Sequence, residues 1–130
     1  MRELSEFLAD YALRAWSPGS VDCCLFLADW AIWLGHLDPA DHLRGTYDSD
    51  AGFRRHIEAA GSVVSLVGGC VDRIGGQPVQ FPACGDIGVI GSASNIHRQF
   101  GAIFDGESWL VRFVQSVGPM TARPLAIWRL

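Results

Sequence analysis

The sequence predicts a single α+β domain over residues 1–130, with N-terminal helices packed on a C-terminal antiparallel sheet. Apolar residues recur at helical spacing in the first part of the chain, whereas short β-branched and aromatic runs follow from Gln77 onward. Of the 130 residues, 49% are hydrophobic. This is enough for one domain with a core and too little chain for two ordinary domains.

The first two predicted helices lie on either side of a Pro18-Gly19 turn. The first spans about residues 2–15, where apolar side chains repeat at helical spacing: Leu4, Phe7, Leu8, Tyr11 and Ala15. The second spans about Val21 to Leu34 and is apolar nearly all round, so we expect it to be buried on most sides. Asp22 is its expected N-cap, and Gly35 its expected C-terminal cap.

Two further helices are predicted before the sheet. Ser49 or Asp50 caps the third, which runs through Ala60 and is closed by Gly61. Ser62 caps a weaker fourth helix that Gly68-Gly69 is expected to interrupt.

Four or five strands are predicted after the helices. They correspond to the segments PVQF (78–81), DIGVIG (86–91), QFGAIF (99–104), SWLVRFV (108–114) and PLAIWRL (124–130). Asp105-Gly106, between two of these segments, is a strong hairpin signal.

Composition and charge exclude several classes of partner. The net charge is −4 and no basic stripe is present, so nucleic acid is not an expected partner. The longest apolar run is interrupted by Asp29 and is shorter than the ~18–20 residues that cross a bilayer, so no membrane insertion is expected. The N-terminal MRELSEFLADY carries charges where a signal peptide would be apolar, so we expect synthesis in the cytoplasm.

The four cysteines are therefore expected to remain free thiols, because the cytoplasm is reducing. Their spacing contains no C-x-x-C, and no H-x-x-x-H accompanies it, so neither a metal nor another cofactor is expected.

Cys23 is the candidate nucleophile. It follows Asp22 in the first turn of the second predicted helix, where unpaired N–H groups and the helix dipole favour a thiolate. The alternative is that Cys23 serves as a small buried hydrophobic residue. Cys24 points about 100° away around the helix, which favours a role in core packing.

Three segments give the chain a resemblance to papain-like cysteine hydrolases, and specifically to the NlpC-type branch of bacterial and phage cell-wall peptidases. The segments are SPGSVDCCLFLADWAIWLG (17–35), ACGDIGVI (83–90) and QFGAIFDG (99–106). The resemblance implies a papain-like fold, with the nucleophile at Cys23 and the catalytic base at the position of Gln99.

The chain departs from that pattern at the base. The amide of Gln99 is neutral and cannot take a proton from a thiol. The third position of the family's triad falls near Val111 or Arg112, and neither can orient an imidazole by accepting its N–H. His97 is the alternative base: two residues before Gln99, it is expected on the same strand face, displaced by ~6.6 Å.

The chain most resembles small phage, prophage and gene-transfer-agent proteins. They share the Asp-Cys helix, an Arg-Gly-x-Tyr loop (here 44–47) and an Ala-x-Trp-Arg ending (here 126–129). The resemblance implies a tail-tip or tail-assembly protein with a degenerate active site, made in the host cytoplasm and then carried in the virion tail. Its implied partners are other tail-tip proteins of the hub or baseplate, together with peptidoglycan.

Two expectations follow about how such a protein would act. In the alternative to a degenerate site, the chain is an active cysteine peptidase that cuts peptidoglycan stem peptides during DNA entry, with Cys23 as nucleophile and His97 as base. In either case, the C-terminal segment around Leu125, Ile127 and Trp128 is a candidate edge strand for docking a partner. The alternative is that this strand is internal to the sheet, so that its deletion would unfold the domain.

Overall fold

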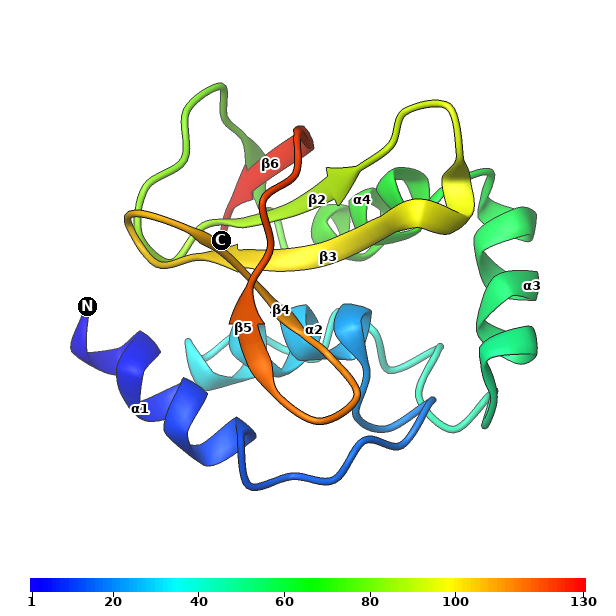
Figure 1. The fold of residues 1–130 in the computed structure, drawn as a ribbon, viewed down its shortest axis with the longest axis horizontal. Coiled ribbons are helices and arrows are strands. Elements are labelled where there is room, and N and C mark those ends of the chain that lie inside the picture. Colours follow the sequence, from blue (N-terminus) through cyan, green and yellow to red (C-terminus); the bar gives the residue numbers. More distant parts are fainter.

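A computed structural model describes residues 1–130 as four helices followed by a six-stranded antiparallel sheet, which confirms the α+β class (Figure 1). The helices are α1 (Arg2–Tyr11), α2 (Cys23–Trp33), α3 (Asp50–Ala60) and α4 (Val63–Asp72). The strands are β1 (Gln77–Pro78), β2 (Ile87–Gly91), β3 (Gln99–Phe104), β4 (Trp109–Arg112), β5 (Val117–Pro119) and β6 (Pro124–Arg129), and a short 3₁₀ helix, η1 (Ile96–Arg98), precedes β3. No helix is both long and apolar enough to span a membrane.

The helix starts follow the predicted capping residues. The side chains of Asp22, Ser49 and Ser62 accept backbone N–H groups at the starts of α2, α3 and α4. These hydrogen bonds join residues two or three positions apart, so the sequence predicts them directly.

Two helix boundaries differ from the prediction. Helix α1 ends at Tyr11 instead of about residue 15, because Leu13 and Ala15 are exposed and another turn would bury no apolar surface. Helix α4 continues through Gly68-Gly69 without interruption. A Cβ at Gly68 would lie 3.5 Å from Trp128, an ordinary van der Waals contact, so this part of α4 packs against the sheet, and that packing outweighs the low helix propensity of glycine, about 1 kcal/mol.

The strands form one sheet in the order β1-β6-β2-β3-β4-β5. Asp105-Gly106 lies in the predicted hairpin between β3 and β4, where the Asp105 carboxylate accepts the N–H groups of Glu107 and Ser108. Strand β5 was not predicted, since VGP contains little of the β-branched and aromatic pattern on which the other predictions rest. It pairs with β4 at the edge of the sheet.

The prediction of a docking edge strand at the C-terminus is wrong. Strand β6 lies between β1 and β2, and it pairs with β2 over Pro124, Ala126, Ile127 and Trp128. Its other side pairs with the two residues of β1. Because Trp128 is buried in the main core, the C-terminal segment belongs to the interior of the fold.

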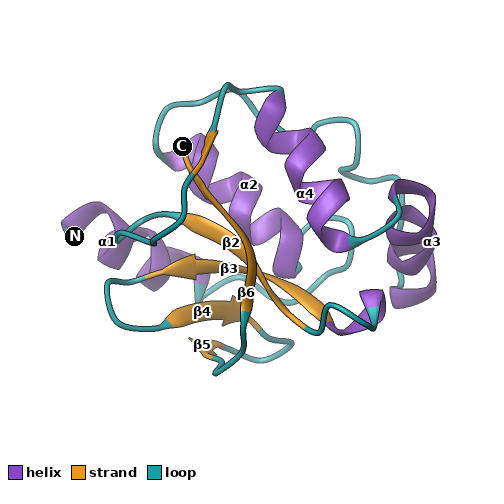
Figure 2. Ribbon diagram, turned by 90° about the horizontal axis from the view of Figure 1, so that it is seen from above, coloured by secondary structure: helices purple, strands orange, loops and turns teal.

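The main core lies between the helices and one face of the sheet. Helices α2 and α4 both pack on this face, and α2 lies directly against β3 (Figure 1 and Figure 2). Successive strand residues point to opposite faces, so Gln99, Gly101 and Ile103 of β3 share the face that α2 covers. A Cβ at Gly101 would lie 2.8 Å from the carbonyl oxygen of Cys23, so glycine lets the start of α2 press against β3. The fold thereby brings the candidate nucleophile to the strand that carries Gln99.

Candidate functional site

The first turn of α2 is held by the buried carboxylate of Asp22. One oxygen accepts the N–H groups of Cys24 and Leu25, at 3.1 and 2.9 Å. The other accepts the N–H of Gly19 at 3.1 Å and the hydroxyl of Tyr47 at 2.5 Å. Asp22 therefore caps the helix and also ties it to two separate loops.

The Arg-Gly-x-Tyr loop (residues 44–47) holds α2 in place through side-chain hydrogen bonds. Arg44 donates to Asp29 of α2 and to Asp38, each at 2.6 Å, so the one charged residue within α2 is paired. Burial, followed by the charge of Asp22, raises the pKa of Tyr47 far above its usual range, so its hydroxyl remains a donor. The residues that support the family resemblance thus have a structural role beside Cys23.

Gly19 lies where the chain before α2 passes close to the Arg-Gly-x-Tyr loop. Its φ of +86° lies in the left-handed region, and a Cβ there would lie only 1.9 Å from the carbonyl oxygen of Tyr47. Glycine at this position lets the segment before α2 approach the backbone of Tyr47 closely.

Cys23 is the first residue of α2 and is partly buried. It lines a cavity of about 260 Å³ together with Trp16, His97, Gln99 and Arg112. The sequence predicted that Cys23 lies in the first helical turn and faces the strand of Gln99, and the structure places it there. Figure 1 shows the corresponding approach of α2 to β3.

Gln99 occupies the position where the family resemblance places the base. Its side chain is only 7% exposed, and its Nε2 donates to the carbonyl of Ser92 at 3.0 Å. Its Oε1 is buried and has no hydrogen-bond partner. The side chain is therefore held in place without supplying a group that can accept a proton from the Cys23 thiol.

His97 is not on the strand. Asn95 caps the short helix η1, which turns the chain just before β3, so the expectation that His97 and Gln99 share a strand face is wrong. The imidazole lines the same cavity as Cys23, but its Nε2 lies 3.5 Å from the carboxylate of Glu58 on α3. No hydrogen bond joins His97 to Cys23.

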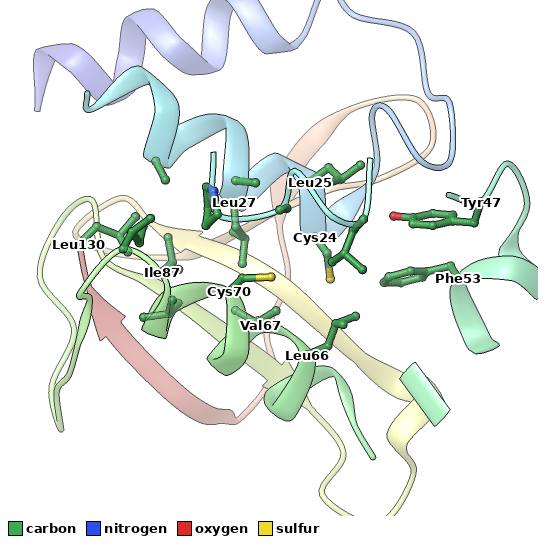
Figure 3. A pocket seen from close by; sticks show the side chains of 17 residues that line it. Cys24, Leu25, Leu27, Tyr47, Phe53, Leu66, Val67, Cys70, Ile87 and Leu130 are labelled. Carbon is green, nitrogen blue, oxygen red and sulfur yellow. The ribbon is translucent and has the colours of Figure 1, made fainter. Parts of the chain in front are cut away.

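Cys24 and Cys70 face a second, separate pocket between α2 and α4. This pocket is apolar, has a volume of about 30 Å³ and receives both sulfur atoms (Figure 3). The neighbouring Cys23 thiol and burial raise the pKa of Cys24 well above its usual value, and burial raises that of Cys70. Both are therefore poor nucleophiles, and Cys23 is the only cysteine that lines the larger cavity.

The structure contains no group of three or more His, Cys, Asp or Glu side chains placed to hold a metal ion. The side chains that line the cavity offer thiol, amide, imidazole, guanidinium, carboxylate and phenol groups.

Sequence reasoning assigned no binding role to Trp16, Tyr47 or Arg112, which all line the cavity. It considered Tyr47 only as part of a shared loop motif and Arg112 only as unsuited to the third triad position. For Arg112 a signal existed, since it is the only charge in the apolar run SWLVRFV. A charge within a predicted strand is most often exposed, whereas Arg112 is 3% exposed.

The fold and the site define an α+β domain with a cysteine at the start of a buried helix, facing a cavity that contains a buried glutamine and a buried arginine. The chain belongs to a protein family described as a domain of unknown function (DUF6950), whose family model matches residues 1–130. No curated protein and no solved structure matches the chain.

Proposed function

We propose that this chain is a phage or gene-transfer-agent tail-tip or tail-assembly protein with an NlpC-type, papain-like fold and a degenerate, non-catalytic active site. One observation carries the loss of catalysis: in the cavity that Cys23 lines, the position where the resemblance places the base is Gln99, whose amide is held by the carbonyl of Ser92. The resemblance of the sequence to small tail proteins carries the assembly role.

The chemistry of a cysteine peptidase explains why Gln99 matters. Attack by Cys23 on an amide requires a base that removes the thiol proton and later protonates the leaving amine. An amide side chain does neither, and the residues of such a triad act as a unit. The Arg112 guanidinium, near the third position, is permanently charged and cannot orient an imidazole by accepting its N–H.

The structural roles of the shared motifs support the assembly part of the proposal. Tyr47 holds the start of α2 and Arg44 holds its middle, at Asp29. Arg129 forms a two-pronged ion pair with the buried Asp86 at 3.0 and 2.8 Å. These residues maintain the fold without requiring catalysis, as expected of a domain kept for its shape. With β6 internal, exposed apolar side chains near the end of α2, such as Trp33 and Leu37, are available to other tail-tip proteins.

The alternative function is an active peptidoglycan cysteine peptidase that aids DNA entry. The observation in its favour is that His97 and Cys23 line one cavity. In this alternative, Cys23 attacks the amide carbonyl, N–H groups at the start of α2 stabilise the oxyanion, and His97 serves as base and acid.

Purified chain is expected to show no turnover of muropeptides at neutral pH above that of a Cys23→Ser control. The reason is the missing base, since losing one member of a catalytic triad removes most of its rate enhancement. Chromatography of the reaction products measures this. Turnover that is lost in both Cys23→Ser and His97→Ala, and retained in Gln99→Ala, would establish the alternative.

In a strain that produces the particles, a Cys23→Ser allele is expected to support as many infectious particles as the wild-type gene, whereas deletion of the gene yields none. The thiol is dispensable if the domain acts only in assembly. Particle titre and electron microscopy of tails measure both outcomes. Intact but non-infectious particles from the Cys23→Ser allele would contradict the proposal, and normal particles after gene deletion would exclude a tail role.

A further inference from the structure

We propose that the cavity beside Cys23 binds a small peptide-like ligand with a free carboxylate, which Arg112 receives while Gln99 accepts an N–H of the ligand. The inference rests on the proposed function in one respect, namely that the cavity is retained without cleaving what it binds. It assigns a ligand class to a site for which the proposed function gives no catalytic role.

The first observation is that the buried Arg112 has no anionic partner. Its residue is 3% exposed, yet it has no carboxylate partner. Its Nη1 donates to the carbonyl oxygens of Phe113 and Ser116, its Nη2 donates to that of Arg14 at 2.8 Å, and its guanidinium lies 5.7 Å from the ring centre of Trp16. Its Nε is buried without a partner. A buried cation is ordinarily paired with an anion, so Arg112 has an unmet preference for one.

Two other arginines show the contrast, the partly buried Arg44 and the exposed Arg129. Arg44 has Asp29 and Asp38, and Arg129 has Asp86. Arg112 alone among these three lacks an acidic group of the protein, and it is the one that lines the cavity. An anion placed in the cavity would supply the missing partner.

Gln99 is the second, independent observation. Its Oε1 is a buried acceptor without a donor, and the residue lines the same cavity. A ligand that satisfies both side chains must offer one N–H donor and one anionic acceptor. An acylated amino acid, or the carboxyl end of a peptide, has both groups close together.

The remaining walls favour an apolar carboxylate over a phosphate. Apolar side chains such as Trp16, Phe100 and Phe113 line much of the cavity, whose volume of about 260 Å³ suits a ligand of one or two residues. Of the three guanidinium nitrogens of Arg112 only Nε lacks any partner, whereas a phosphate presents several acceptor oxygens that each require a donor. The carboxylate of Asp22 is already engaged by four protein donors and does not compete for Arg112.

Three other titratable groups border the cavity: Asp50, Arg54 and His97. Arg54 is exposed on α3, so it offers a screened charge at the cavity mouth instead of a desolvated one. Since Gln99 Oε1 and Arg112 Nε are shielded from solvent, binding requires a side-chain rotation that brings them to the cavity surface.

The test compares N-acetyl-L-phenylalanine with its amide, N-acetyl-L-phenylalaninamide, on the full chain. Amide chemical shifts followed by nuclear magnetic resonance give both the Kd and the location of binding. The acid is expected to perturb residues around Trp16, Gln99 and Arg112, and the amide to bind at least about tenfold more weakly, as for loss of a charge-assisted hydrogen bond. Equal affinity of acid and amide, or no saturable shifts in this cavity, would overturn the inference.

Matched variants locate the carboxylate. Arg112→Gln and Gln99→Leu are expected to weaken binding of the acid, and the matched control Arg54→Gln is expected to retain it. Retention in Arg112→Gln with loss in Arg54→Gln would overturn the assignment. If Arg112→Gln does not fold, the acid–amide comparison and Gln99→Leu still decide, because neither removes the Arg112 contacts. Cleavage of the bound acid would contradict the proposed function while supporting binding at this site, so the two failures are distinguishable.

Discussion

Removal of residues 124–130 is expected to unfold the chain instead of producing a soluble domain that has lost a docking strand. The deletion removes β6 from between β1 and β2, and with it the buried side chains of Ile127 and Trp128. It also removes Arg129, which is the ion-pair partner of the buried Asp86. Circular dichroism and amide spectra measure the loss of structure.

A point substitution isolates the largest part of this effect. Trp128→Ala is expected to lower the free energy of unfolding by about 3–5 kcal/mol, the usual range for truncating a large aromatic residue in a core. The matched control is Phe81→Ala, since Phe81 is 79% exposed and its loss should change stability by less than about 0.5 kcal/mol. Denaturant titration measures both variants. A folded truncation, or equal effects of Trp128→Ala and Phe81→Ala, would contradict the interior position of β6.

Asp22→Ala is expected to destabilise the chain by about 2–5 kcal/mol. Loss of a helix N-cap accounts for about 1–2 kcal/mol. The hydroxyl of Tyr47 then loses its acceptor in a buried site, which adds about 1–3 kcal/mol. The substitution also releases the first turn of α2 and with it Cys23.

The control for Asp22→Ala is Ser62→Ala, which removes the cap of α4 at an exposed position and should cost about 1 kcal/mol. Asp22→Asn keeps a side-chain oxygen for the helix cap and should fall between the two. Denaturant titration compares the three variants. An effect of Asp22→Ala no larger than that of Ser62→Ala would show that the hydrogen bond from Tyr47 contributes nothing.

Part of the candidate site could be predicted because it depends on local signals. An Asp followed by a Cys and a long apolar run predicts a capped, buried helix, and Cys23 lies at its first position as expected. The period of two along β3 then places Gln99 and Gly101 on one face. Which helix covers that face is a tertiary property, and the sequence indicated it only through resemblance.

The sequence by itself determined the elements whose hydrogen bonds join near neighbours: the capped starts of α2, α3 and α4 and the hairpin at Asp105-Gly106. Only the tertiary structure decided the interior place of β6, the continuity of α4 through Gly68-Gly69, the turn that takes His97 off the strand, and the burial of Arg112. The physical reason is the range of the interactions. A cap or a turn is formed within three or four residues, whereas the pairing of β6 with β2, the contact of Gly68 with Trp128 and the hydrogen bond from Arg112 to Arg14 join parts of the chain far apart in sequence.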